Sequence, residues 1–109
     1  MCGIVGLHNN TKVDTQFVIN ACAKMNKRGP DNSEILSLHN NICFGHVRLS
    51  ILDLTVDSNQ PFNSLCGNYS ITFNGEIYNF KEIKSMLEAD GCEFRTSGDT
   101  EVLLQLYIR

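Results

Sequence analysis

Two short runs of strand-like composition flank an asparagine pair near the middle of the chain, and they constrain the fold more than any other feature. The runs cover residues 34–38 and 42–47, and the pair between them is Asn40-Asn41. Asparagine tolerates the left-handed backbone conformation that a tight hairpin needs. The pattern therefore predicts two antiparallel strands joined by a short turn.

The rest of the sequence alternates between strand and helix signals. Short apolar or alternating runs predict strands over residues 3–7, 49–54 and 69–73. Helical spacing of apolar residues predicts helices over residues 15–28, 80–90 and from 99 onward. Asp14 is a suitable N-cap for the first helix, and Gly91 is suited to end the second. Residues 55–68 lack a period and are expected to form a loop.

The last predicted helix carries its apolar residues on one stripe, formed by Val102, Leu103, Leu106 and Tyr107. It reaches Arg109 without the Gly, Asn or Pro that commonly closes a helix. We therefore expect the sequence to be the N-terminal portion of a larger domain.

The composition is that of an ordinary globular protein, with 42% hydrophobic and 19% charged residues. Residues 1–109 suffice for one small domain, and helices mixed with antiparallel hairpins predict the α+β class. The net charge is −3 and the 9 basic residues are scattered, which argues against a nucleic-acid or membrane surface. No apolar run has membrane-spanning length, and the N-terminus lacks the features of a signal peptide, so we expect a cytoplasmic protein.

The chain has five cysteines, Cys2, Cys22, Cys43, Cys66 and Cys92. An odd number without an export signal does not indicate a disulfide framework. No pair has C-x-x-C spacing and the histidines lack zinc-ligand spacing, so we expect no metal site. Cys22 and Cys43 lie in apolar patterns and are interpreted as small core residues.

Cys2 is distinguished by its place directly after the initiator Met1. Methionine aminopeptidase removes an initiator methionine when the next side chain is small, and a cysteine qualifies. Cys2 would then carry a free α-amine and a thiol on one residue, a base and a nucleophile together. The alternative is that cysteine occupies this position by chance.

Two other segments have turn signals. Asn74-Gly75 is a strong hairpin-turn dipeptide, but its side-chain amide and the Gly75 backbone N–H could instead form an oxyanion hole. Glycine there would let a reacting carbonyl approach the backbone. The R-G-P-D segment at 28–31 is interpreted as a structural turn after the first helix.

Three charged residues could bind an amino acid together. Arg48 lies among apolar neighbours, and its guanidinium suits bidentate capture of a carboxylate. Glu76 and Asp99 could hold an ammonium group. Taken singly, Arg48 could be a solvated strand residue, Glu76 an exposed turn carboxylate and Asp99 a helix N-cap.

Six segments occur in an order that resembles a known family. They read M-C-G-I-V-G at 1–6, R-G-P-D at 28–31, G-H-V-R-L-S-I-L-D-L at 45–54, Q-P-F at 60–62, F-N-G-E-I-Y-N at 73–79 and G-D-T-E-V-L at 98–103. Together they resemble the glutaminase domain of asparagine synthetase, a class II glutamine amidotransferase of the N-terminal nucleophile hydrolase group. The resemblance covers essentially the whole chain.

The resemblance implies roles for residues of matching type. Cys2 resembles the catalytic nucleophile, and Asn74 and Gly75 resemble the oxyanion hole. The remaining residues implied to bind glutamine are Arg48, Leu49, Ser50, Ile51 and Leu52, with Arg48 on the α-carboxylate, and Glu76 and Asp99 on the α-ammonium group. No metal is implied for this step.

The resemblance also implies a four-layer αββα sandwich, of which this sequence supplies only part because the family's domain is longer. The synthetase domain, which would use ATP and Mg²⁺, is absent. The implied partners are L-glutamine and the remainder of the synthetase chain, with a homodimer as an option for the full-length enzyme.

The leading hypothesis is hydrolysis of the glutamine side-chain amide by Cys2, which releases ammonia for the synthesis of asparagine from aspartate. One alternative is an inactive fragment that serves only as a binding or structural module. Another is a glutaminase domain whose ammonia is delivered to a different acceptor.

Overall fold

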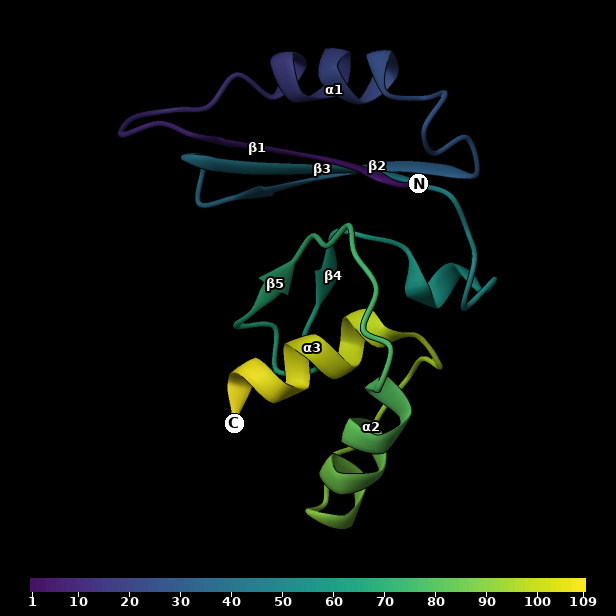
Figure 1. Ribbon diagram of the computed structural model, residues 1–109. Coiled ribbons are helices and arrows are strands. Elements are labelled where there is room, and N and C mark those ends of the chain that lie inside the picture. The colour runs from purple at the N-terminus through teal and green to yellow at the C-terminus, as the bar shows by residue number, and fades with distance from the viewer.

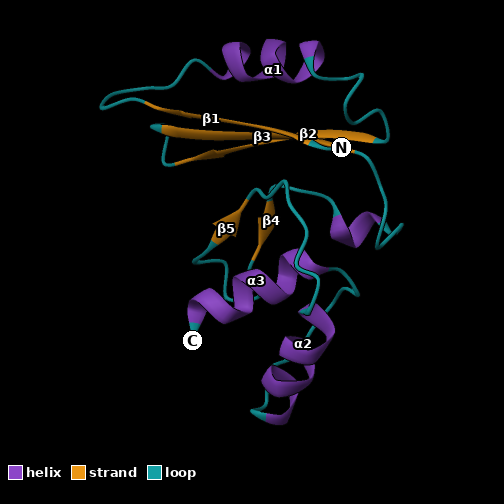
Figure 2. Ribbon diagram, in the orientation of Figure 1, coloured by secondary structure: helices purple, strands orange, loops and turns teal.

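The computed structural model describes all 109 residues, which form helices and antiparallel sheets stacked in layers (Figures 1 and 2). The elements in chain order are β1 (Gly3–His8), α1 (Thr15–Lys24), β2 (Asn32–Leu38), β3 (Ile42–Arg48), η1 (Val56–Ser58), β4 (Phe62–Asn63), β5 (Ser70–Ile71), α2 (Phe80–Ala89) and α3 (Asp99–Ile108). Helix α1 lies on one side of the β1-β3-β2 sheet, and β4, β5, α3 and α2 lie on the other (Figure 1). The α+β class predicted from the sequence is confirmed.

The central sheet is built around the predicted hairpin. Its strand order is β1-β3-β2, and both pairs are antiparallel. The turn between β2 and β3 has left-handed residues at His39 (φ 51°) and Asn40 (φ 63°), one residue earlier than the predicted asparagine pair. On the other edge of β3, Gly3 lies opposite Val47, which brings the N-terminus beside the end of β3.

Helix α1 covers the outer face of this sheet (Figure 1). Asp14 caps the helix as predicted, because its carboxylate accepts the backbone N–H of Gln16 at 3.0 Å. The core between helix and sheet consists of Val13, Val18, Cys22, Cys43 and Val47, which confirms the interpretation of the two cysteines. The helix approaches closely at Gly45, where a Cβ would lie 2.6 Å from the Cys22 Sγ and 2.8 Å from the Val18 Cγ1.

The other half of the molecule contains the two-stranded β4–β5 sheet and the helices α2 and α3 (Figure 1). The two helices pack against each other, and α3 also contacts β5. Leu87 of α2 and Val102 and Leu104 of α3 are buried in these contacts. Gly91, with φ of 90°, follows the end of α2 as predicted. None of the helices is long and apolar enough to cross a lipid bilayer.

The strand predicted over residues 49–54 is wrong, because this segment is irregular. Its first backbone N–H groups are directed at side chains rather than at a neighbouring strand. Leu49 donates to the Cys2 Sγ, and Ser50 donates to the Asp31 carboxylate. The predicted strand over residues 69–73 shortens to Ser70–Ile71, and the predicted loop over 55–68 contains η1 and β4.

Two helix predictions also require correction. The first helix ends at Lys24 rather than at residue 28, and a turn follows it. On α3 the predicted apolar stripe is only partly buried, since Leu106 is 49% and Tyr107 78% exposed whereas Leu104 is 3% exposed. The side chains of Asp99 and Glu101 in the first turn of α3 are buried together with Leu104, so the buried side of the helix differs from the predicted stripe.

Candidate active site

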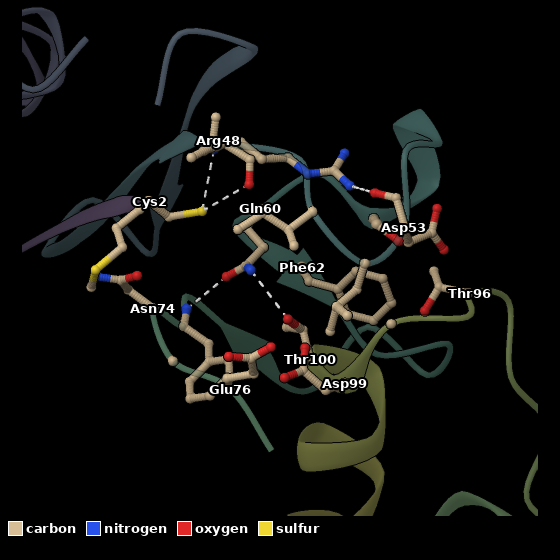
Figure 3. A pocket seen from close by; sticks show the side chains of 18 of the residues that line it. Cys2, Arg48, Asp53, Gln60, Phe62, Asn74, Glu76, Thr96, Asp99 and Thr100 are labelled. Atoms are coloured by element: carbon tan, nitrogen blue, oxygen red, sulfur yellow. Dashed lines mark hydrogen bonds between the residues drawn. The ribbon is translucent and has the colours of Figure 1, made fainter. Parts of the chain in front are cut away.

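A cavity of about 390 Å³ opens between the end of the central sheet and the half of the molecule that contains β4, β5, α2 and α3. Its walls come from the start of β1, the end of β3, the segment before α2 and the start of α3 (Figure 3). Of the site residues predicted from the sequence, all except Ser50 line it: Cys2, Arg48, Leu49, Ile51, Leu52, Asn74, Gly75, Glu76 and Asp99. The fold therefore gathers into one cavity residues that lie far apart in the sequence.

The Cys2 thiol lies against the backbone at the end of β3. Its Sγ accepts a hydrogen bond from the Leu49 N–H at 3.3 Å and lies 3.6 Å from the Leu49 carbonyl oxygen (Figure 3). The Arg28 Nε donates to the Cys2 carbonyl at 3.3 Å. Backbone and side-chain contacts thus hold Cys2 in place beside the end of β3.

Only Arg28 of the R-G-P-D segment lies in the turn that follows α1, at residues 25–28; the rest of the segment leads from this turn past the end of β3, where Pro30 bridges to Arg48, and it supports the site. A Cβ on Gly29 would lie 2.4 Å from the Val47 carbonyl carbon, so only glycine permits this approach of the segment to β3. The Asp31 N–H donates to the Arg48 carbonyl at 2.9 Å, and its carboxylate accepts the Ser50 N–H at 2.7 Å. The segment therefore fixes the backbone on both sides of Leu49, the residue that contacts the thiol.

Asn74 and Gly75 do not connect two strands, so they are not the turn of a hairpin. They form an exposed bend between β5 and α2. Neither the Asn74 side chain nor the Gly75 N–H is hydrogen-bonded to another protein group. A Cβ on Gly75 would lie 2.7 Å from the Phe73 ring. Two unpaired donors at the cavity wall are suited to a ligand oxygen.

Arg48 is 7% exposed and is held by the loop that follows it. Its Nη1 donates to the Thr55 carbonyl at 2.7 Å and to the Asn59 Oδ1 at 2.6 Å, and its Nη2 donates to the Asp53 carbonyl. A guanidinium has five N–H groups, so the Nε–H and one Nη2–H have no protein acceptor. The charge of Arg48 lines the cavity in a fixed orientation, with donors left for an anion.

The two predicted carboxylates occupy different environments. Asp99 is buried at the first turn of α3, and its Oδ2 accepts the Ile77 N–H at 2.9 Å. Glu76 is exposed at the cavity wall. Arg48 and this pair of carboxylates complement a zwitterionic amino acid, which presents one carboxylate and one ammonium group.

Sequence reasoning missed several residues of the cavity wall, and two of them, Gln60 and Asp53, hold other parts of the wall in place. Gln60 is buried, and its Oε1 accepts the Phe73 N–H at 2.6 Å while its Nε2 donates to the Thr100 Oγ1 at 3.2 Å. It therefore joins the residue before Asn74 to the start of α3. The only sequence signal was the Q-P-F segment, to which no role had been attached.

Another missed residue is Asp53, which follows the R-L-S-I-L run. It is 7% exposed, and its carboxylate accepts hydrogen bonds from Thr55 and Ser97. Burial opposes the charge of Asp53, but these hydrogen bonds outweigh it and lower its pKa well below the usual range. Asp53 is therefore an ionised group at neutral pH. No group of three or more His, Cys, Asp or Glu side chains is arranged to bind a metal ion.

Comparison with known proteins identifies the family of the chain. Residues 1–109 match the family of glutamine amidotransferase domains. The chain belongs to this family.

Three similar proteins are much longer than this chain. Asparagine synthetase [glutamine-hydrolyzing] 3 of Bacillus subtilis is 36% identical over 99% of this chain and 18% of its own length, and asparagine synthetase [glutamine-hydrolyzing] 1 of the same organism is 40% identical over 98% and 17%. The amidase chry2 of Gibberella zeae is 33% identical over 98% of this chain and 18% of its own length. The chain thus spans less than a fifth of the length of these curated relatives.

Proposed function

We propose that Cys2, once Met1 has been removed, is the nucleophile that hydrolyses the side-chain amide of L-glutamine. The observation that carries the proposal is the shared cavity. It brings a thiol, two unpaired hydrogen-bond donors at Asn74 and Gly75, and the charges of an amino-acid clamp to one place. Membership of the glutamine amidotransferase family supports the same reaction.

The proposed reaction proceeds through a covalent thioester. The α-amine of Cys2 accepts the thiol proton, and the Sγ forms a bond to the amide carbon of glutamine. The carbonyl electron pair moves to the oxygen, where the Asn74 Nδ2–H and the Gly75 N–H stabilise the negative charge. The protonated amine then gives its proton to the amide nitrogen, the carbon–nitrogen bond breaks and ammonia leaves.

Water completes the cycle in the proposed second half-reaction. It attacks the thioester carbon while the α-amine accepts one of its protons. The carbon–sulfur bond breaks, the sulfur recovers a proton from the amine, and glutamate departs. Arg48 holds the α-carboxylate of the substrate, and Glu76 and Asp99 hold its α-ammonium group throughout.

For the full-length protein we propose that ammonia is used to convert aspartate to asparagine, as the names of the Bacillus relatives suggest. ATP and Mg²⁺ would be used by the remainder of the chain, outside residues 1–109. We also propose that the helix, sheet, β-hairpin and helix layers of Figure 1 are part of a four-layer αββα sandwich of the N-terminal nucleophile hydrolase kind. A cytoplasmic location would keep the Cys2 thiol reduced.

A Cys2→Ala variant of the full-length protein tests the nucleophile. We expect glutamine hydrolysis to fall to background, while synthesis from free ammonia continues, because only the first reaction needs the thiol. Cys66→Ala is the matched control, since Cys66 is an exposed free thiol that does not line the cavity. Unchanged glutamine hydrolysis by Cys2→Ala, or an intact mass that retains Met1 in active protein, would contradict the assignment.

A second candidate keeps the glutaminase and changes the acceptor of ammonia. This candidate is supported by the similarity to chry2, which is 33% identical over 98% of this chain and is named an amidase rather than an asparagine synthetase. An assay with ammonia, ATP and aspartate distinguishes the two, because formation of asparagine supports the first candidate and its absence in an otherwise active glutaminase supports the second.

A further inference from the structure

Asp53 joins two segments that lie far apart in the sequence. Its Oδ2 accepts the Ser97 N–H and the Ser97 hydroxyl, each at 2.9 Å, across a separation of 44 residues. Its Oδ1 accepts the Thr55 N–H at 2.8 Å and the Thr55 hydroxyl at 2.6 Å. Four donors converge on one buried carboxylate, so both oxygens are fully occupied and cannot serve a ligand.

The backbone of Asp53 continues this connection to Arg48. The Asp53 carbonyl accepts a hydrogen bond from the Arg48 Nη2. Ser97 precedes Gly98 and Asp99, the residues with which α3 begins. Hydrogen bonds therefore connect Ser97, just before α3, to the carboxylate of Asp53, and the carbonyl of Asp53 to the guanidinium of Arg48.

We propose that Asp53 is a positioning residue that sets the separation between Arg48 and Asp99, the two sides of the clamp for an α-amino acid. The inference rests on the proposed function, because it assigns Arg48 to the substrate carboxylate and Asp99 to the ammonium group. Asp53 acts on binding and touches no reacting atom. Without it, the loop that follows β3 and the segment before α3 lose the link that keeps the two charges at a fixed distance.

The chain contains a matched control for this residue. Glu101 is also a buried carboxylate, 1% exposed, and it accepts hydrogen bonds from the Arg95 N–H, the Thr96 N–H and the Thr96 hydroxyl. These partners lie within six residues of it, so Glu101 holds the segment that leads into its own helix. Glu101 is absent from the cavity wall, and its side-chain hydrogen bonds go to Arg95 and Thr96 rather than to the loop after β3. The two carboxylates thus share burial and chemistry but differ in what they connect.

The test compares Asp53→Asn with Glu101→Gln in the full-length protein. Each substitution replaces an acceptor oxygen by an amide that donates, which leaves at least one pair of donors facing each other. For Asp53→Asn we expect the KM for glutamine to rise on the order of ten-fold or more, with a smaller change in kcat. For Glu101→Gln we expect a lower melting temperature and a KM within two-fold of wild type.

Two alkylating reagents give an independent readout. Because Cys66 is also an exposed thiol, labelling is measured at Cys2 by peptide mass spectrometry. There, iodoacetamide reports only on thiol reactivity, whereas a glutamine-like electrophile with an α-amino-acid group must also use the clamp. We expect Asp53→Asn to slow labelling by the glutamine-like electrophile and leave labelling by iodoacetamide unchanged. General loosening of the structure would change both rates together.

The outcomes separate the inference from the proposed function. An unchanged KM in folded Asp53→Asn, or an equal rise in Glu101→Gln, would overturn the positioning role while leaving the glutaminase intact. A wild-type protein that neither hydrolyses glutamine nor reacts with the glutamine-like electrophile would overturn the proposed function and the inference with it. A Ser97→Ala variant, which removes one of the four donors, should give a smaller rise in KM than Asp53→Asn and so support the connection.

Discussion

Single residues in the cavity differ in whether the protein already satisfies their hydrogen-bonding groups. Asp53 and Gln60 are buried and fully engaged, so they fix the positions of their neighbours. The Asn74 side chain and the Gly75 N–H have no protein partner. Both residues are exposed at the cavity wall, so these donors are free to bind a ligand oxygen.

Asn74→Ala should test the free donors. Loss of one oxyanion-hole donor typically reduces kcat by about 10²–10³-fold. We expect a loss of this size for glutamine hydrolysis, with little change in KM, because the donor acts on charge that develops in the transition state. Steady-state kinetics measure the effect. Asn10→Ala, an exposed asparagine outside the cavity, is the control and should retain wild-type activity.

His46 of β3 should make stability depend on pH. It is fully buried, and neither ring nitrogen has a hydrogen-bond partner. Burial lowers its pKa below the ordinary value of 6.5, and the nearby Arg48 acts in the same direction, while the Phe73 backbone and Glu34 oppose the shift. The unfolded chain therefore binds the proton more readily, and the stability that His46 contributes is complete above about pH 6.5 and is lost as pH falls below it.

Urea unfolding at about pH 7.5 and about pH 5.5 measures this dependence. We expect the free energy of unfolding to be lower at the acidic pH. A His46→Asn variant should show a smaller difference between the two conditions, whereas His8→Gln, which changes an exposed histidine, should behave as wild type. Equal pH dependence in His46→Asn and wild type would contradict this prediction. Asp53 remains ionised across this range because its pKa is lowered.

At the scale of elements, the spacing of apolar residues correctly predicted the positions of the longer helices and strands. The strands β1, β2 and β3, the helices α1 and α2 and the start of α3 lie where the pattern predicted them. The pattern was wrong over residues 49–54, because the Cys2 Sγ and the Asp31 carboxylate take the hydrogen bonds that a neighbouring strand would have taken. It was also wrong for the buried side of α3, where Glu101 is buried and accepts hydrogen bonds from the preceding segment at Arg95 and Thr96.

Gly45→Ala should test the packing of α1 on the sheet. A Cβ at this position would lie 2.6 Å from the Cys22 Sγ and 2.7 Å from the Val5 Cγ1, so the helix would have to move. Overpacking of this kind costs about 1–3 kcal/mol of unfolding free energy. Adding Cys22→Ala should recover part of the loss. Gly6→Ala, where the new Cβ would lie 3.6 Å from the Phe44 ring, should be nearly neutral and serves as the control.

For the whole molecule, the residues of the site could be predicted from the sequence, but the contacts that hold them in place could not. Family resemblance named the thiol, the donors and the clamp, and the cavity contains all of them except Ser50. The contacts that hold them join residues 44 and 47 positions apart, such as Asp53 with Ser97 and Cys2 with Leu49. A pattern with a period of two or four residues carries no information on such pairs. Asp53 and Gln60 therefore emerged only from the folded arrangement.

The pairing of β1 with β3 determines where the Cys2 thiol lies, so labelling of this thiol can report on the alignment of the strands. Cys2 directly precedes Gly3, which lies opposite Val47, so the alignment of two strands determines which backbone N–H meets the sulfur. A shift of one residue would turn every β1 side chain to the opposite face and present the thiol to the wrong part of β3. Alkylation of Cys2 by a glutamine-like reagent would therefore count the molecules whose strands are correctly aligned, and would distinguish them from molecules that are merely compact.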